Sequence, residues 1–271
     1  MFRPPVFSGS FYPADPAALR RDVEALLREA HDPPVEVAAL MAPHAGYIYS
    51  GRVAGRTYGS AILPSRLILM GPNHTGRGAP LAVCDSGEWE TPLGRVPVDT
   101  GLARRLLKLC PLLEVDMVAH QREHALEVQL PFLQVRVPDL RIVPVCVGSP
   151  RLEHLQALGT ALARLGGSVE EPFAIVISSD MTHYEPREEA ERQDRKAFAA
   201  LERVDARELH RVVGRERITM CGVYPAVAAL EACRGLGARL GKLVEYATSG
   251  DVTGDYGDVV AYAGMHFRRA G

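Results

Sequence analysis

The sequence has little of several features that define specialised classes of protein. It contains only five cysteines in 271 residues, and none forms a Cys-x-x-Cys pair, so we interpret them as reduced thiols. No apolar run approaches the length of a membrane span. The first residues, MFRPPVFSGSFYP, lack the apolar core of a signal peptide. These absences argue against a disulfide framework and a membrane protein, and they predict a cytoplasmic location.

A strong charge of either sign is also missing. The formal net charge is −2, from 31 Lys and Arg against 33 Asp and Glu, which gives no electrostatic case for nucleic acid as a partner. The chain has no Walker loop, no Gly-x-Ser-x-Gly elbow and no Gly-x-Gly-x-x-Gly after a strand. With 47% hydrophobic residues the chain can bury a full core, and we expect a single domain over residues 1–271.

Strand and helix patterns alternate along the chain. Near-continuous apolar runs predict strands at about 36–41, 66–71, 140–148 and 172–180, and two closing strands at 242–250 and 258–267. Helical patterns occupy 15–30, 51–62, 99–110, 123–134 and 150–166, with two or three further helices in 186–237. Apolar strands of this kind need cover on both faces. The pattern therefore predicts an α/β fold whose mostly parallel or mixed sheet has helices on both faces.

Titratable residues follow several of these strands. His44 lies in APHAGYIYSG, His74 in GPNH, Asp180 and His183 in SSDMTHY, and Asp251 in YATSGDVTGD. In open α/β sheets, ligands bind beyond the carboxyl ends of the strands. We therefore expect these side chains to meet at one edge of the sheet.

Each of these residues also has a structural explanation when it is taken alone. His44 could cap a carbonyl in its turn, and His74 could be an exposed loop residue. Residues 178–180 could form the N-cap of a following helix, and His183 could be a packed ring. Four strand ends would each need a separate explanation of this kind, which favours a shared site.

The segment AHQREHALEVQLPFLQ offers a second group of candidates. On a helix, His120 and His124 would share one face, and so would Glu123 and Glu127. The spacing of His124 and Glu127 resembles that of carboxylate-bridged metal helices, although it is common by chance. A solvated helix face is the alternative interpretation.

Two imidazoles and one carboxylate form the ligand set of non-haem Fe(II) sites. His44, His74 and Asp251 would supply this set, and Asp180 and His183 would act as acid–base groups. Fe(II) is the expected ion. Zinc would accept the same ligands and make a bound water nucleophilic.

Seven motifs in order along the chain resemble the MEMO family, whose bacterial and archaeal members belong to the AmmeMemoRadiSam system. They are FSGSFYP, APHAGYIYSG, GPNH, EHALEVQLPFLQ, SSDMTHY, CGVYP and YATSGDVTGD with VVAYAG. The resemblance implies the fold of class III extradiol dioxygenases and a pocket that contains His44, His74, Asp180 and His183. It also adds His124 to the catalytic candidates.

The family implies further properties. Its animal members carry a metal-binding cysteine, which we match to the segment SGDV; this chain has no cysteine there, and Asp251 is the nearest candidate. Those members are described as binding iron or copper and as adaptors for phosphorylated receptor peptides. The microbial system implies radical-SAM and AMMECR1-like protein partners.

Three functions follow from the sequence. The first is a metal-dependent, dioxygenase-like oxidoreductase acting on an unknown substrate. The second is a non-catalytic binding or adaptor protein that uses the same pocket on a vestigial enzyme fold, with a small molecule or peptide as ligand. The third is a zinc-dependent hydrolase with Asp180 or Glu127 as its base.

Overall fold

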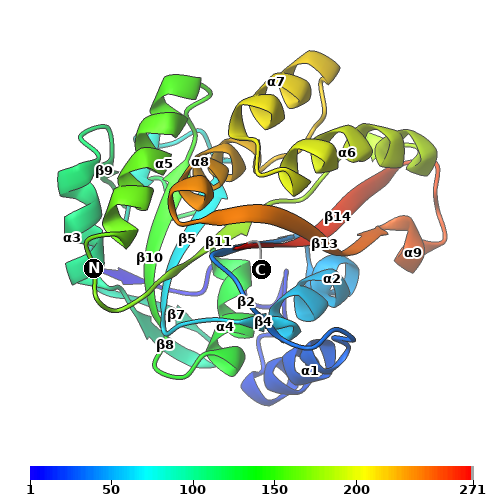
Figure 1. Ribbon diagram of the computed structural model, residues 1–271. Helices are drawn as coiled ribbons and strands as arrows, with labels where there is room; N and C mark the ends of the chain where they lie inside the picture. Colours follow the sequence, from blue (N-terminus) through cyan, green and yellow to red (C-terminus); the bar gives the residue numbers. More distant parts are fainter. Residues whose placement is uncertain (270–271) are drawn as a thin grey trace.

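A mixed sheet forms the centre of the molecule (Figure 1). The computed structural model describes residues 1–269, and within this range the sheet has nine strands in the order β12-β14-β3-β11-β5-β10-β6-β9, with β13 paired to β14. Its middle strands β3 (Ala39–Ala42), β11 (Ala174–Ser178), β5 (Arg66–Pro72) and β10 (Arg141–Val147) are parallel. Their carboxyl ends therefore lie at one edge.

The outer strands make the sheet mixed. β6 (Leu81–Val83) and β14 (Val259–Arg269) run antiparallel to their neighbours β10 and β3. The remaining strands of this sheet are β9 (Glu114–Val115), β12 (His183–Glu185) and β13 (Ala238–Thr248). A separate three-stranded sheet contains β1 (Phe2–Arg3), β7 (Glu88–Thr91) and β8 (Gly94–Pro97). A two-stranded sheet contains β2 (Val35–Glu36) and β4 (Ala61–Ile62).

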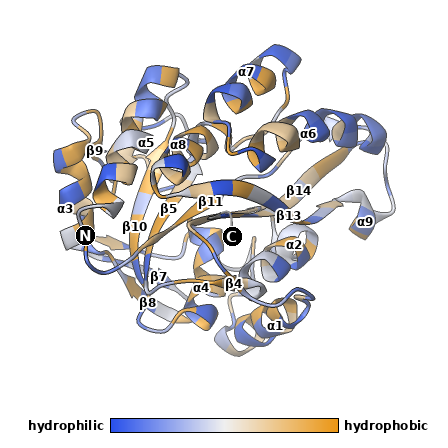
Figure 2. Cartoon of the chain, viewed as in Figure 1, coloured by the Kyte–Doolittle hydropathy of each residue, from blue (hydrophilic) through white to orange (hydrophobic). Residues whose placement is uncertain are grey.

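Helices cover both faces of the central sheet, and each face has its own hydrophobic core. One face is covered by α3 (Thr100–Leu109), α5 (Leu152–Gly166), α6 (Arg187–Glu202), α7 (Ala206–Glu216) and α8 (Val223–Gly235). The other is covered by α1 (Pro16–Arg28), α2 (Tyr47–Gly59) and α4 (Leu130–Arg136). Figure 2 shows the apolar strands between these helices. Among residues 1–269, no helix has both the length and the apolar composition that a membrane crossing requires.

Successive residues of a strand pack into opposite cores. In β5, Ile68 and Met70 belong to the core under α5 and α8, whereas Leu67 and Leu69 belong to the core under α1, α2 and α4. This alternation is why β5 is apolar from Leu67 to Pro72, after the Arg66 that begins it: both of its faces are buried.

The local signals for helix starts agree with the structure. The Asp15 side chain accepts a hydrogen bond from the Ala18 N–H, and Pro16 opens α1. The Asp99 side chain caps α3 through the Leu102 N–H. Leu19 and Val23 of α1 are fully buried, as their spacing predicts.

One predicted helix is wrong in its first half. Residues 123–134 do not form a single helix: a short 3-10 turn, η1 (Glu127–Gln129), precedes α4, and Pro131 lies in the first turn of α4. The Arg3 guanidinium accounts for the interruption. Its nitrogens donate to the carbonyl oxygens of His120 and Glu123, each at 2.8 Å. These are acceptors that a continuing helix would need for its own amides.

Candidate metal centre

Two of the predicted histidines meet at the carboxyl edge of the sheet. His44 lies two residues beyond β3 and His74 two residues beyond β5, and their ring centroids are 5.2 Å apart. The two strands are parallel and separated by β11 alone, so their following turns reach the same crevice.

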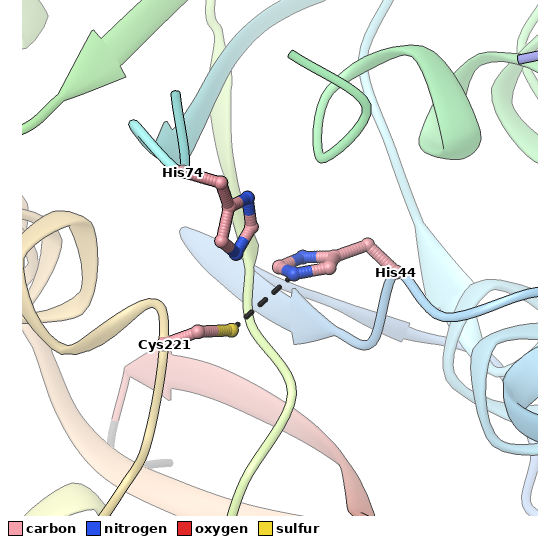
Figure 3. Close-up of side chains that lie close together, drawn as sticks. All are labelled: His44, His74 and Cys221. Carbon is pink, nitrogen blue, oxygen red and sulfur yellow. Dashed lines mark hydrogen bonds between the residues drawn. The ribbon is translucent and has the colours of Figure 1, made fainter. Parts of the chain in front are cut away.

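Cys221 supplies a third donor to this pair. One ligand atom each from His44, His74 and Cys221 lies within 4.8 Å of the others. The Cys221 Sγ is 3.3 Å from His44 Nε2, as Figure 3 shows. Cys221 comes from the loop between α7 and α8, so the site joins the sheet edge to the helical layer.

Asp251, the third ligand expected from the sequence, does not lie with the two histidines. It sits in the short helix α9 (Gly250–Thr253), where its carboxylate accepts from the Thr248 N–H at 2.8 Å and from the Arg187 guanidinium at 3.0 Å. Its carboxylate closes a turn and forms a half-exposed ion pair. The donor group that gathers around His44 and His74 therefore contains Cys221 and not Asp251.

His44 is almost completely buried and held from two sides. Its backbone N–H donates to Asp180 Oδ1 at 2.7 Å, and its ring Nδ1 is 2.8 Å from Ser178 Oγ. Burial, with the neighbouring rings of His124 and His74, holds the pKa of His44 well below its usual range. The ring is therefore neutral near pH 7, the form that binds metals.

Glu123 orients His74. The His74 N–H donates to Glu123 Oε2 at 2.6 Å, and the ring Nδ1 is 2.8 Å from Glu123 Oε1. Burial alone would raise the pKa of Glu123, but the hydrogen bonds from His74 and from the Ala125 N–H outweigh burial and keep the pKa below its usual range. An ionised Glu123 accepts a hydrogen bond from the Nδ1–H group of His74, which leaves the lone pair of Nε2 free.

Asp180 and His183 lie beside this cluster. Burial raises the pKa of Asp180 to about 6, and its backbone N–H approaches the Cys221 Sγ at 3.2 Å. The His183 ring is half-buried, with Nδ1 3.0 Å from the Thr219 carbonyl oxygen. No helix begins at residues 178–180, so the helix-cap explanation does not apply to them.

His124 completes a row of three imidazoles. Its ring stacks on His74 with centroids 4.6 Å apart and lies 5.2 Å from His44. Burial, reinforced by the charge of His74, lowers the pKa of His124 to about 4. His74, Glu123 and His124 form a second group of donors with atoms within 4.8 Å of one another.

Glu127 is neither a solvated side chain nor part of this group. It is fully buried and accepts from Arg3 at 2.5 Å and from the Tyr12 hydroxyl at 2.7 Å. The amide N–H groups of Val6 and Phe7 donate to it as well. With these four partners, Glu127 anchors the N-terminal segment. Its burial argues against the solvated helix face that was the alternative interpretation. Its four hydrogen bonds also disfavour a role as the base of a hydrolase.

The residues at the centre fit a transition-metal ion. His44 and His74 each form a hydrogen bond through Nδ1, to Ser178 and Glu123, and their Nε2 atoms remain available as ligands, as is general for metal-binding imidazoles. Burial and the nearby Asp180 carboxyl raise the pKa of the Cys221 thiol, and a bound cation would reverse this by favouring the thiolate. Two imidazoles and one thiolate suit zinc, iron or copper.

Comparison with known proteins identifies the family. The family model described as Memo-like protein matches residues 3–266. The chain belongs to the Memo family. A Memo relative from Aquifex aeolicus, a MEMO1 family protein, is 43% identical over 98% of this chain and 98% of its own. Another, from Methanopyrus kandleri, is 40% identical over 99% of this chain and 100% of its own. The resemblance found in the sequence motifs is confirmed.

A solved structure supports the fold of this Memo protein. The crystal structure of an uncharacterized protein from Escherichia coli K12 aligns with a TM-score of 0.56 at 15% identity, over 84% of this chain and 99% of that chain. At this identity the likeness concerns the fold alone. It fits the dioxygenase-like α/β fold with a central mixed sheet that the sequence predicts, so that prediction is confirmed.

Cys221 is the residue that sequence reasoning missed in this Memo protein. It follows no strand, so the rule that ligands gather beyond strand ends cannot find it. The signal available was its place in the motif CGVYP, between two helical patterns. A match of the family's cysteine to the segment SGDV points to Asp251 instead.

Proposed function

We propose that this protein binds a transition-metal ion through His44, His74 and Cys221 and uses it in redox chemistry. The observation that supports this is the meeting of three donor atoms from three separate segments within 4.8 Å. Iron(II) and copper are the expected ions, with zinc as the redox-inactive alternative, because a thiolate beside two imidazoles favours softer ions than a carboxylate does.

The surrounding residues suit an anionic, oxygen-rich ligand. A divalent ion held by two neutral imidazoles and one thiolate keeps a positive charge, and three protein ligands leave coordination positions open. When bound, the ion supplies Lewis acidity and, for iron or copper, an electron. The exposed side of His74 and His124, about a third and a fifth of their side-chain surfaces, gives a substrate access.

Asp180 is the proposed proton carrier. Its carboxyl is buried, has a pKa of about 6 and is fixed by the His44 N–H at 2.7 Å. A group with a pKa near neutral can both take and return a proton during turnover. His183 lies three residues on, at the start of β12, and is the second acid–base candidate.

Metal analysis tests the first part of the proposal. Protein purified without added metal is assayed for bound iron, copper and zinc, and metal-free protein is then titrated with Co²⁺. We expect one ion per chain and a thiolate-to-cobalt charge-transfer band that Cys221→Ser removes. Cys110→Ser, which changes a buried cysteine at the end of α3, should keep the band. Equal cobalt binding by the wild type and a His44→Ala, His74→Ala double variant would contradict the site.

Oxygen consumption tests the second part. We expect metal-dependent oxygen uptake with a catechol-type substrate, and Asp180→Asn should reduce turnover by about 10²- to 10⁴-fold while leaving the metal content unchanged. A protein that binds metal but consumes no oxygen with any oxygen-rich aromatic substrate would favour the binding-protein alternative. Turnover of an ester that is restored only by Zn²⁺ would favour the hydrolase.

A further inference from the structure

A chain of buried polar side chains leads to the ring of His44 from behind. It runs from the Tyr58 hydroxyl through the Gln129 amide and the Ser178 hydroxyl to His44 Nδ1, with successive distances of 2.7, 2.8 and 2.8 Å. All four residues are at most 1% exposed. Because solvent cannot compete here, the donors and acceptors within the chain of contacts must satisfy one another.

The orientation of the Gln129 amide is fixed by the backbone. Its Nε2 lies 3.0 Å from the carbonyl oxygen of Pro43, which can only accept, so the amide group that faces it must be the donor. Gln129 Oε1 then accepts from the Tyr58 hydroxyl. The other hydrogen of Nε2 is left for Ser178 Oγ, which therefore acts as an acceptor in this contact.

The Ser178 hydroxyl in turn fixes the proton on His44. A hydroxyl has one hydrogen and two lone pairs. The hydrogen goes to the carbonyl oxygen of Ala125 at 2.6 Å, since that atom cannot donate, and one lone pair faces Gln129. The second lone pair faces His44 Nδ1, which must then carry a hydrogen. A neutral imidazole has a single N–H, so Nε2 of His44 has a free lone pair.

We propose that Ser178, held by Gln129, is a positioning residue that locks His44 in the Nδ1–H tautomer before any metal binds. The free lone pair of Nε2 points at the Cys221 thiol, 3.3 Å away, which donates its hydrogen to it in the metal-free protein. The consequence for metal affinity rests on the proposed function, whereas the tautomer itself does not. An incoming ion finds one ligand lone pair already in place.

Nitrogen-15 NMR of metal-free, histidine-labelled wild-type protein near pH 7.5 tests the tautomer directly. His44 is assigned by the loss of its signals in His44→Gln. We expect a protonated Nδ1 and an unprotonated Nε2. A proton on Nε2 of His44 would overturn the proposal, and this measurement does not depend on the folding of a Ser178 variant.

A Ser178→Ala variant tests the consequence for the metal. Loss of the acceptor should shift His44 toward the Nε2–H form and lower the Co²⁺ or Zn²⁺ affinity by about 10- to 100-fold. Ser178→Thr, which keeps the hydroxyl, should restore both. The matched control is Ser60→Ala, because Ser60 is also buried and also donates to a carbonyl, that of Arg56, but lies outside this chain of contacts.

The outcomes separate this inference from the proposed function. Wild-type tautomer and wild-type affinity in Ser178→Ala would refute the positioning role even if the metal site is real. Conversely, a wild-type protein that binds no metal would refute the proposed function, while the NMR measurement on the same metal-free protein would still decide the tautomer.

Discussion

A cysteine ligand and a carboxylate ligand predict different effects of pH on metal affinity, and Cys221 stands where the sequence predicts a carboxylate. A carboxylate is ionised near neutral pH, whereas burial and Asp180 raise the pKa of the Cys221 thiol and keep it protonated without a metal. The low pKa values of His44 and His124 keep these rings neutral under the same conditions. Metal binding near neutral pH must therefore release the thiol proton.

We accordingly predict that the metal affinity rises with pH between about 6 and 8, by roughly tenfold per unit, as for the release of one proton. Cys221→Ser should bind more weakly and lose this slope, because a serine hydroxyl does not ionise in this range. Competition with a chromophoric chelator at several pH values measures the slope. Asp251→Asn serves as control and should behave as the wild type; a loss of metal affinity in this variant instead would restore Asp251 as the ligand.

At the scale of elements, the N-terminal segment depends on one buried ion pair. The Arg3–Glu127 pair is at most 2% exposed, and Glu127 also binds the Tyr12 hydroxyl. This attachment places Phe7 and Phe11 against His124, with ring centroids 5.5 and 4.8 Å away. The segment therefore forms an aromatic wall beside the proposed metal centre.

Glu127→Gln should destabilise the fold by about 3 kcal/mol, because it leaves the buried Arg3 guanidinium without an opposite charge. Urea denaturation measures the loss, and limited proteolysis should cut the segment before Tyr12 more readily. The control Glu189→Gln removes an exposed pair with Arg192 and should leave the midpoint unchanged. A wild-type midpoint in Glu127→Gln would show that the Arg3–Glu127 ion pair does not stabilise the fold.

The ionisation of Asp99, the N-cap of α3, makes the stability of the fold depend on pH. Burial alone would raise its pKa, but the hydrogen bonds from Arg66 at 2.7 Å and from the Leu102 N–H outweigh burial and hold the pKa below its usual range. A carboxyl with a depressed pKa stabilises the fold above its unfolded pKa of about 3.9, and this contribution is lost as pH falls through the folded value.

Asp99→Asn should therefore be less stable than the wild type by about 2 kcal/mol at pH 7, since asparagine can still cap α3 but loses the charge-assisted bond to Arg66. The difference should stay constant down to about pH 5 and shrink below it. Urea titrations at pH 7, 5 and 4 measure it. A difference that grows on acidification would contradict the assigned sign.

The same scale shows what a sequence can predict. The strands of the sheet core and the histidines after them follow from apolar runs and turns, which are local signals. The interrupted helix before α4 does not, because its cause is Arg3, more than a hundred residues away along the chain. Cys221 comes from the helical layer and not from a strand end, and the packing of α7 and α8 places it at the site. The periodicity of apolar residues carries no information on this packing.

At the scale of the whole molecule, the site brings together segments that lie far apart in the sequence. The proposed ligands come from the turns after β3 and β5 and from the loop before α8, so an ion bound there would bridge the sheet and one helical layer. Because the unfolded chain cannot gather these three donors, metal binding should add its free energy to the stability of the folded state.

A free metal concentration about 100 times the Kd should stabilise the fold by about 2.7 kcal/mol. For a chain of 271 residues that corresponds to a rise in Tm of roughly 5 °C. Calorimetry of metal-free and Zn²⁺-loaded protein measures the shift, and a chelator should reverse it. The variant lacking His44, His74 and Cys221 should show no shift. An equal rise in this variant would place the stabilising ion elsewhere, because an ion stabilises only through donors that the folded state holds together.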